Sequence, residues 1–194
     1  FTDIDGNFPN HSPDTSNPDS YEALRAAVAE NNAEVGIAFD GDGDRLGVLT
    51  GRGEIIWADR LMMLFAQDLL TRSPGADIIF DVKCSRELTR LITKDGGRPL
   101  MWKTGHSLIK AKLKETGAPL AGEMSGHIFF ADRWHGFDDG MYSAGRLLEI
   151  LSLEGDDSTA LFDRLKTGVN TPELSIKISD QAKFPLINKL IKKA

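Results

Sequence analysis

The stretch DIIFDVKCSRELTRLITKDGGRPLMW, residues 77–102, decides the fold class of this chain. It begins with a continuous apolar run over residues 77–82, which is typical of a strand covered on both faces of a sheet. Ser85 then predicts the start of a helix over Arg86–Lys94, and the glycine pair that follows predicts its end. A second strand is predicted over Arg98–Trp102. This order of strand, helix and strand indicates a βαβ unit, in which the two strands are parallel.

The alternation of strands and helices continues on both sides of this unit. Before it, Asp59 is expected to cap a helix over residues 60–72. The other predicted elements, in chain order, are a helix that starts at Asn17 and Pro18, strands over Val35–Phe39, Leu46–Thr50 and 54–57, a helix over 107–116, strands over 119–122 and Ile128–Phe130, and a helix from Asp138 or Asp139 to about Leu153. Elements at this spacing predict an α/β fold with a mixed, largely parallel sheet and helices on both faces.

The C-terminal tail carries weaker signals of structure. The sequence there suggests a short helix over 163–166 and an extended linker at residues 171–172. Alternating apolar and polar residues then predict a strand over 173–179. A final helix is expected over 184–193, with Pro185 in its first turn.

The composition excludes several classes of protein. The 194 residues are 41% hydrophobic, which is too apolar for a disordered chain, and a formal net charge of −6 argues against nucleic acid as a partner. No apolar run reaches the roughly 18 residues that a membrane span needs, and no signal peptide is evident, so no membrane partner is expected. Cys84 is the single cysteine, which excludes an intrachain disulfide and favours a small buried side chain in a cytoplasmic protein.

The strongest chemical signal is the segment DGDGDR, residues 40–45. Asp40, Asp42 and Asp44 alternate with glycines, and in a straight strand such residues lie ~6.6 Å apart, too far to share one metal ion. The glycines allow the backbone to curl so that three carboxylates converge. Hard divalent cations such as Mg²⁺ prefer these oxygen ligands, so the segment predicts a metal site between two strands. A solvated acidic turn is the simpler alternative.

Two other known loops share part of this pattern. An EF-hand loop needs Gly at its sixth position and Glu at its twelfth, where this chain has Arg45 and Gly51. The nucleophile loop of a haloacid-dehalogenase-type phosphatase is similar, with Asp40 as nucleophile, Asp42 as acid/base and the pair at 138–139 as later metal ligands. The third carboxylate and the arginine after it disfavour this alternative, but the residues alone leave it open.

A second polar cluster occurs in the segment GEMSGH, residues 122–127. Glu123 and Ser125 lie two residues apart after a predicted strand and are framed by glycines. One carboxylate and one hydroxyl at this spacing can hydrogen-bond neighbouring hydroxyl groups of a sugar. A turn with a capping serine is the alternative.

Polar residues follow two further strands of the predicted sheet. Lys83 comes directly after the strand over 77–82, where open α/β sheets place ligand sites. Residues 104–107 lie at a predicted helix start, which favours anions, and His106 can exchange a proton near neutral pH. Taken alone, Lys83 is equally consistent with an ordinary surface lysine, and residues 104–107 are equally consistent with an ordinary helix cap. Since Asp40 also follows a predicted strand, we expect these side chains to gather at one edge of the structure.

Together these segments resemble the α-D-phosphohexomutase family, in particular its bacterial phosphomannomutase/phosphoglucomutase branch. Residues 39–45 are similar to the metal loop of that family and residues 122–127 to its sugar-binding loop. Further similar segments lie at 81–85, 103–107 and 136–140. The family has four α/β domains around a cleft. The resemblance implies one complete domain of this type with parts of two neighbours, namely the end of domain 2 at 1–54, domain 3 at 55–166, and a linker with the start of domain 4 at 167–194.

The resemblance also implies a reaction, a cofactor and residue roles. In this family a phosphoserine donates its phosphoryl group to a hexose 1- or 6-phosphate, of mannose or glucose, through a sugar 1,6-bisphosphate intermediate. The implied roles are Mg²⁺ binding for Asp40, Asp42 and Asp44, phosphoryl contact for Arg45, hydroxyl binding for Glu123 and Ser125, substrate binding for Thr104 and Gly105, and phosphate contact or proton transfer for Lys83, His106 and His127. Which of the last three is the general base stays open.

Two family elements have no counterpart in the 194 residues. They are the loop with the phosphorylated serine and the phosphate-clasping loop of domain 4. Since the chain also starts at Phe1, we expect a fragment that needs the missing domains of its own polypeptide. Alone it is expected to have no mutase activity, to bind a divalent ion weakly and to expose a sheet edge. A non-catalytic module that binds metal or sugar phosphate is the alternative of a different class.

Overall fold

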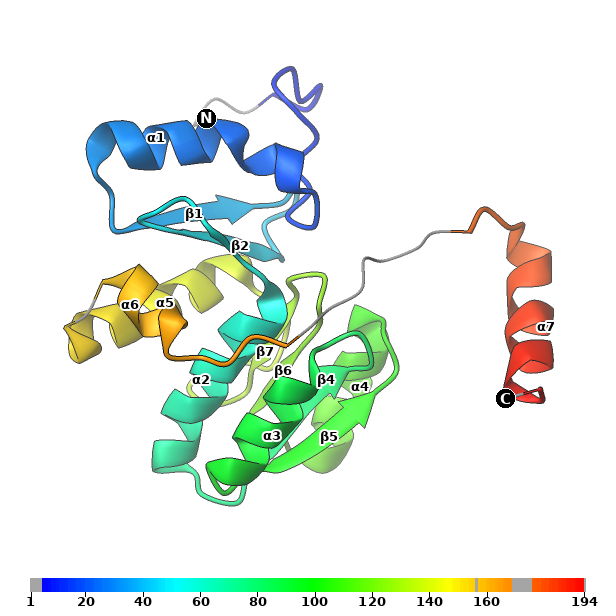
Figure 1. Ribbon diagram of the computed structural model, residues 1–194. Helices are drawn as coiled ribbons and strands as arrows, with labels where there is room; N and C mark the ends of the chain where they lie inside the picture. The colour runs from blue at the N-terminus through cyan, green and yellow to red at the C-terminus, as the bar shows by residue number, and fades with distance from the viewer. Residues whose placement is uncertain (1–4, 156, 169–175, 194) are drawn as a thin grey trace.

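The computed structural model describes residues 5–155, 157–168 and 176–193, and these residues contain two β-sheets (Figure 1). The first sheet is antiparallel, with the order β1-β2-β3, and its strands are β1 (Val35–Phe39), β2 (Leu46–Thr50) and β3 (Ile55–Ile56). The second has the order β5-β4-β6-β7, and its strands are β4 (Asp77–Asp81), β5 (Arg98–Trp102), β6 (Leu120–Gly122) and β7 (Ile128–Phe130). All the strands predicted before the C-terminal tail are present.

Helices connect and cover these sheets. In chain order they are the 3₁₀-helix η1 (Pro18–Tyr21), α1 (Glu22–Asn31), α2 (Ala58–Arg72), α3 (Arg86–Lys94), α4 (His106–Thr116), α5 (Gly140–Glu154), α6 (Ser158–Asp163) and α7 (Asp180–Ile191). Within the described part of the chain, none of them combines the length and the apolar character required to cross a membrane.

The second sheet is largely parallel, which confirms the predicted fold class. β4 is parallel to both β5 and β6, and Ile78 pairs with Pro99 on one side and Leu120 on the other. β7 returns antiparallel to β6. The central position of β4 explains why its sequence is a continuous apolar run, because a central parallel strand is covered on both faces.

Helices cover both faces of this sheet, as predicted. Ile78 and Phe80 of β4 pack in one core with apolar side chains of α2 and α3. Ile79 points to the opposite face and packs with Ile109 and Leu113 of α4. Successive residues of one strand therefore contribute to two separate cores.

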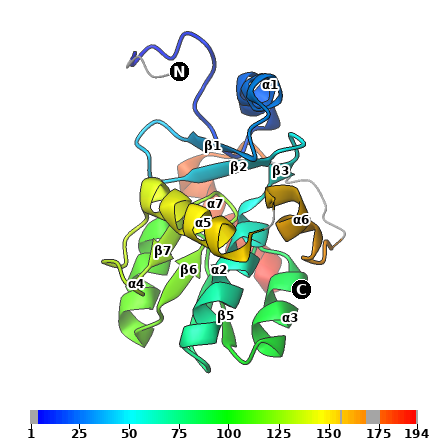
Figure 2. The same cartoon turned by 90° about the vertical axis from the view of Figure 1, so that its left-hand side faces the viewer.

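The first sheet lies between α1 and α5, which cover its opposite faces (Figure 2). On the α1 side, a Cβ atom on Gly36 would lie 2.7 Å from a methyl group of Val28, so glycine allows the helix to approach the strand. On the other side, Val48 of β2 and Leu147 of α5 belong to the same core. Among the described strands β1 has one neighbour, so it forms an edge of its sheet, as expected.

The start of α2 differs from the prediction. Asp59 does not cap this helix, which begins at Ala58, two residues before the predicted start, and has no side-chain cap hydrogen bond at its N-cap, Trp57. Asp59 lies in the first turn and is buried, and its carboxylate accepts a hydrogen bond from the backbone N–H of Ser85, 3.2 Å away. The prediction failed because an acidic residue is favoured both at the N-cap and in the first turn. Ser85 and Asp139 cap their helices as predicted.

The helix predicted over residues 163–166 is wrong. Asp157 accepts a hydrogen bond from the backbone N–H of Ala160, 2.8 Å away, and so caps α6, which ends at Asp163. α6 therefore covers Ser158–Asp163 and shares only Asp163 with the predicted span, because its cap, Asp157, lies only two residues after Gly155, the C-cap of α5.

The prediction for the last residues is partly wrong. Residues 176–179 form no strand, and the remainder of the strand predicted over 173–179, with the linker at 171–172, lies outside the described residues. A final helix is present, but α7 begins at Asp180, so Pro185 lies inside it and not in its first turn. This helix buries no residue and stands away from the two sheets in Figure 1.

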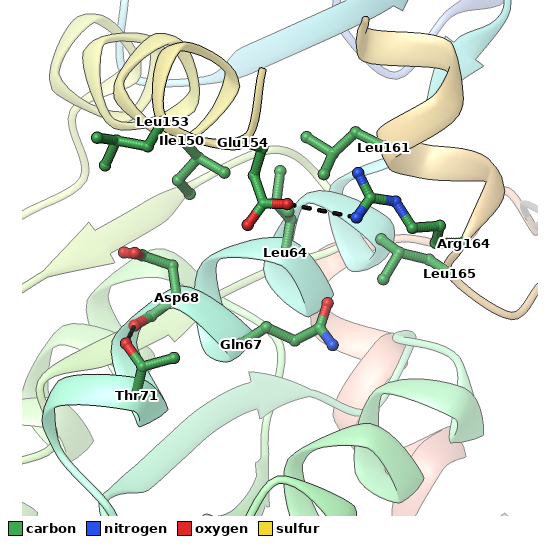
Figure 3. A pocket seen from close by; sticks show the side chains of 10 residues that line it. All are labelled: Leu64, Gln67, Asp68, Thr71, Ile150, Leu153, Glu154, Leu161, Arg164 and Leu165. Atoms are coloured by element: carbon green, nitrogen blue, oxygen red, sulfur yellow. Dashed lines mark hydrogen bonds and ion pairs between the residues drawn. The ribbon is translucent and has the colours of Figure 1, made fainter. Parts of the chain in front are cut away.

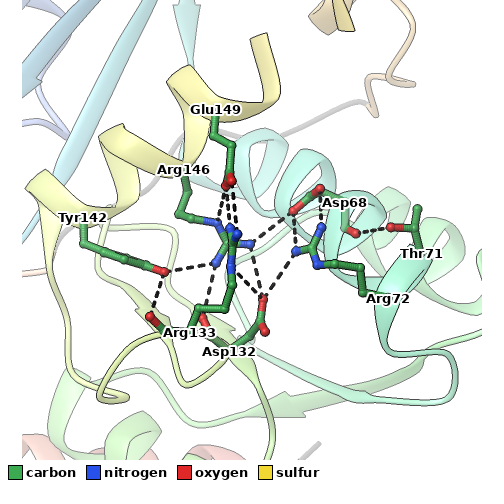
Figure 4. A network of polar contacts seen from close by, with 8 residues as sticks. All are labelled: Asp68, Thr71, Arg72, Asp132, Arg133, Tyr142, Arg146 and Glu149. Carbon is green, nitrogen blue, oxygen red and sulfur yellow. Dashed lines mark hydrogen bonds and ion pairs between the residues drawn. The ribbon is translucent and has the colours of Figure 1, made fainter. Parts of the chain in front are cut away.

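Arg146 of α5 is the centre of a network of charged side chains (Figure 4). Its side chain is 4% exposed, and its Nη2 lies 3.1 Å from Asp68 and 3.3 Å from Asp132. The guanidinium also lies over the ring of Phe130, 4.5 Å from the centroid. Arg72 binds the same two aspartates. The network therefore holds α2, α5 and the segment after β7 together.

We predict that Arg146→Met lowers the free energy of unfolding by about 2–3 kcal/mol, somewhat below the ~3–5 kcal/mol of a fully buried pair because Arg72 remains beside the two aspartates. The control is Arg133→Met, since Arg133 is about half exposed and its ion pair with Glu149 is worth about 1 kcal/mol or less. Urea denaturation of both variants measures the difference. Equal losses in the two variants would contradict the structural role of Arg146.

Candidate functional site

Two loops from different sheets lie side by side in the structure. The Asp loop (residues 40–45) connects β1 to β2, and the GEMSGH loop (residues 122–127) connects β6 to β7. The backbone N–H of Leu46 donates a hydrogen bond to the carbonyl of Gly126, 3.1 Å away, and an isolated antiparallel β-bridge joins the loops at the neighbouring residues. The carboxylates of the Asp loop, which belongs to the first sheet, therefore lie beside the loop between β6 and β7 of the second sheet.

Two further segments join these loops. The N–H of Gly140 donates to the carbonyl of Gly43 at 3.1 Å, and a Cβ atom on Gly140 would lie 2.7 Å from that oxygen, so only glycine allows this approach. The N–H of Gly105, at the start of α4, donates to Oε1 of Glu123 at 2.5 Å. The structure therefore brings the segments that contain Gly105 and Gly140 to the same place as the two loops.

The buried carboxyl group of Asp81, at the end of β4, binds two of these segments and the turn that follows β4. It accepts hydrogen bonds from the hydroxyl of Thr104 at 3.0 Å, from the N–H of Met124 at 3.2 Å and from the thiol of Cys84 at 3.1 Å. Cys84 is buried as predicted. Lys83 lies in the same turn with its side chain exposed, and its place in the site stays a prediction.

The Asp loop curls as its glycines predict. Oxygen atoms of Asp40, Asp42 and Asp44 lie within 4.8 Å of one another, and Gly43 supplies the bend with a φ of +75°. The side chain of Asp40 is 3% exposed, whereas Asp42 is exposed. An all-oxygen group of this kind suits a hard divalent cation.

Arg45 is held by two carboxylates. Its Nε lies 2.6 Å from Asp40, and its backbone N–H donates to the other oxygen of that carboxylate at 3.1 Å. Its Nη1 lies 3.3 Å from Asp14, a residue of the N-terminal loop that carries no sequence signal for the site. Burial alone would raise the pKa of Asp40, but the hydrogen bonds and charge of Arg45 outweigh it and lower the pKa.

His127 connects the two loops through its ring. Its Nδ1 lies 2.8 Å from the hydroxyl of Ser125 and 3.3 Å from the buried carboxylate of Glu123, and its Nε2 lies 3.4 Å from Asp44. Burial lowers the pKa of His127, but the hydrogen bond to Glu123 and the surrounding carboxylates outweigh it, so the pKa is raised. Burial also raises the pKa of Asp44, and the neighbouring aspartates add to this shift while His127 opposes it.

Sequence reasoning named Asp138 only as a helix cap or, in the phosphatase alternative, as a metal ligand, and it missed Lys110. Asp138 lies 3.1 Å from Nδ1 of His106 and 2.7 Å from Nζ of Lys110. The ring of His106 stacks on His127, with centroids 5.3 Å apart. The sequence contained a signal for Lys110, because His106 and Lys110 are four residues apart on one helix and so share a face.

A cavity of about 380 Å³ lies elsewhere, between α2, α5 and the α6 segment (Figure 3). It is lined by Leu64, Gln67, Asp68, Thr71, Ile150, Leu153, Glu154, Leu161, Arg164 and Leu165. None of the predicted site residues is among them. The candidate site is therefore the junction of the polar loops and not this cavity.

We predict that the raised pKa of His127 depends on Glu123. In metal-free protein, Glu123→Gln should lower the pKa of His127, because the hydrogen-bonding carboxylate is lost while burial remains. Since the pKa in the folded state is above the unfolded value of about 6.5, protonated His127 stabilises the fold below about pH 6.5 and loses this effect as pH rises through the folded pKa.

NMR titration of the histidine ring protons measures this change, with the chemical shifts of exposed His135 as the internal control. A pKa of His127 that is the same in the parent protein and in Glu123→Gln would contradict the proposed coupling.

Comparison with known protein families gives two matches along the chain. A model described as phosphoglucomutase/phosphomannomutase, alpha/beta/alpha domain III, matches residues 57–167, and the corresponding domain II model matches residues 1–53.

Individual proteins are also similar. A phosphomannomutase/phosphoglucomutase of Pseudomonas putida is 60% identical over 190 residues, which are 98% of this chain and 41% of that protein, and a phosphoglucomutase of Neisseria gonorrhoeae is 55% identical over 93% of this chain and 39% of its own length. A crystal structure of a phosphoglucomutase/phosphomannomutase family protein from Burkholderia thailandensis has a TM-score of 0.86 and 62% identity, covering 89% of this chain and 37% of that one. This chain spans about two fifths of the length of such relatives, and it belongs to the phosphoglucomutase/phosphomannomutase family.

Proposed function

We propose that this chain supplies the metal loop and the sugar-binding loop of a cytoplasmic phosphohexomutase, which interconverts the 1- and 6-phosphates of mannose and glucose through a sugar 1,6-bisphosphate. The observation that carries the proposal is the direct contact between the Asp loop and the GEMSGH loop, through the 3.1 Å hydrogen bond from Leu46 to Gly126. A phosphoryl group and the sugar that receives it must lie side by side, and these two loops provide adjacent sites of suitable chemistry.

Asp40, Asp42 and Asp44 are proposed to hold Mg²⁺. Their oxygens already converge within 4.8 Å, and the group contains no nitrogen ligand, which matches the preference of this ion. When bound, Mg²⁺ would neutralise negative charge on a transferring phosphoryl group. Arg45, whose guanidinium lies between Asp40 and Asp14, is proposed to bind a phosphoryl oxygen beside the metal.

Glu123 and Ser125 are proposed to bind adjacent sugar hydroxyls. The Glu123 carboxylate is held in place by Gly105 on one oxygen and faces His127 with the other, so its position is fixed before a sugar binds. Because each carboxylate oxygen has a second lone pair, both can still accept from a hydroxyl group.

His127 is the general base that the geometry supports best among Lys83, His106 and His127. It is partly buried and oriented on Nδ1 by Glu123 and Ser125, as bases are in many active sites. His106 is exposed on the first turn of α4 and, with Lys83 and Thr104, is proposed to contact phosphate.

The haloacid-dehalogenase alternative is disfavoured by the contacts of its implied residues. Both oxygens of Asp40 accept hydrogen bonds from Arg45, which makes it a poor nucleophile. Asp139 caps α5 and accepts from the indole N–H of Trp134, so it has a structural role.

We predict that Asp42→Asn weakens binding of a divalent cation to the 194-residue chain roughly tenfold, because a charged oxygen ligand is lost from an exposed position that does not affect the core. Competition between Mn²⁺ and Mg²⁺, followed by electron paramagnetic resonance, measures both affinities. The matched control is Asp163→Asn, an exposed aspartate at the end of α6. Unchanged metal affinity in Asp42→Asn would contradict the metal loop, and a phosphoryl adduct on Asp40 would favour the phosphatase.

We predict that Ser125→Ala weakens binding of glucose 1,6-bisphosphate, with Mg²⁺ present, by about fivefold, as the loss of one neutral hydrogen bond of ~1 kcal/mol implies. Titration calorimetry on the 194-residue chain measures it, and Ser152→Ala, on the exposed side of α5, serves as the control. If both variants bind the bisphosphate equally, the GEMSGH loop is not the sugar site.

A further inference from the structure

A second group of metal-ligand side chains lies beside the Asp loop. One ligand atom from each of Asp44, His106, His127 and Asp138 lies within 4.8 Å of every other. Nε2 of His127 is 3.4 Å from Asp44, and Nδ1 of His106 is 3.1 Å from Asp138. Tetrahedral zinc, with bonds of about 2.0–2.2 Å, places its ligands roughly 3.4 Å apart. Each His–Asp pair therefore has this spacing already.

The other nitrogen of each imidazole already has a polar neighbour. Nδ1 of His127 faces Glu123 and Ser125, which leaves Nε2 directed toward Asp44. Nε2 of His106 lies 3.5 Å from the hydroxyl of Ser107, which leaves Nδ1 directed toward Asp138. Histidines that bind metals in proteins show this arrangement, in which a carboxylate or another polar group holds the nitrogen that does not bind.

The charges and the ligand types select the class of metal. Lys110 binds Oδ1 of Asp138 at 2.7 Å, so Oδ2 of that carboxylate is the oxygen on the side of His106. Two carboxylates balance the charge of a dication, and two imidazole nitrogens favour Zn²⁺, Co²⁺ or Ni²⁺ over Mg²⁺. Mg²⁺ prefers oxygen ligands in octahedral geometry, which the Asp loop offers.

We propose that Asp44, His106, His127 and Asp138 form a binding site for a transition-metal dication of the Zn²⁺ class, separate from the all-oxygen group of the Asp loop. The two groups have only Asp44 in common. His106 is therefore specific to the second group and Asp42 to the first, and this difference allows the two sites to be tested separately.

The experiment is titration of the 194-residue chain, free of Mg²⁺, with Zn²⁺ by calorimetry and with Co²⁺ by visible absorption. We expect one Zn²⁺ ion bound with an affinity that His106→Gln weakens at least tenfold, since a ligand is lost from a side chain that is half exposed and so not needed for folding. The Co²⁺ complex should show the strong visible bands of four-coordinate geometry, and His106→Gln should abolish them. Asp138→Asn, a second ligand variant, should have the same effects.

Two control variants make the result specific. His135→Gln removes an exposed imidazole outside the group, and Asp42→Asn removes a ligand of the Asp loop only; neither should change the affinity for Zn²⁺. The proposal is overturned if Zn²⁺ binds equally to His106→Gln and the parent chain, if Asp42→Asn weakens Zn²⁺ as much as His106→Gln does, or if no Zn²⁺ binds. Because Mg²⁺ affinity is measured separately, failure of the metal loop is distinguishable from failure of this site.

Discussion

The buried carboxyl group of Asp81 is the interaction on which the candidate site depends. It stands at the carboxyl end of the central strand β4 and accepts one hydrogen bond from each of the loops that follow β4, β5 and β6, through Cys84, Thr104 and Met124. Parallel strands end at the same edge of a sheet, so one group can reach all three loops. A buried donor or acceptor left unpaired costs ~1–3 kcal/mol, which makes the three loop positions mutually dependent.

The Asp loop reaches this edge from the other sheet. The Asp loop belongs to an antiparallel hairpin, and the hydrogen bonds from Leu46 to Gly126 and from Gly140 to Gly43 attach it to the second sheet and to the start of α5. α5 is in turn fixed to α2 by Arg146 and its aspartates. The separation between the Asp loop and the GEMSGH loop is therefore set by packing between the sheets, and a disturbance of α5 should alter the candidate site without contact to any ligand.

The sequence predicted most of the fold because its signals are local. Continuous apolar runs such as that of β4 specify buried strands, and Ser85 and Asp139 specify helix starts. It also placed Thr104 and the GEMSGH loop at one edge, since strand ends in a parallel sheet are predictable, whereas Asp40 reaches that edge from the antiparallel sheet. It could not separate a capping from a buried aspartate at Asp59, because tertiary contact with Ser85 decides that difference. Asp14 reaches Arg45 across the fold without any pattern in its own segment.

The candidate site contains an excess of carboxyl groups. Four carboxylates lie in direct contact with basic side chains: Asp40 with Arg45, Asp138 with Lys110, and both Asp44 and Glu123 with His127. Asp42 adds a further carboxyl group. Carboxylates therefore outnumber the permanently positive side chains, and the phosphorylated sugar proposed as substrate would add more negative charge. A bound dication or a protonated imidazole must supply the balance, which is consistent with the raised pKa of His127. The same surplus accounts for two overlapping ligand groups, one of oxygens alone and one with imidazoles, which differ in the metals that they favour.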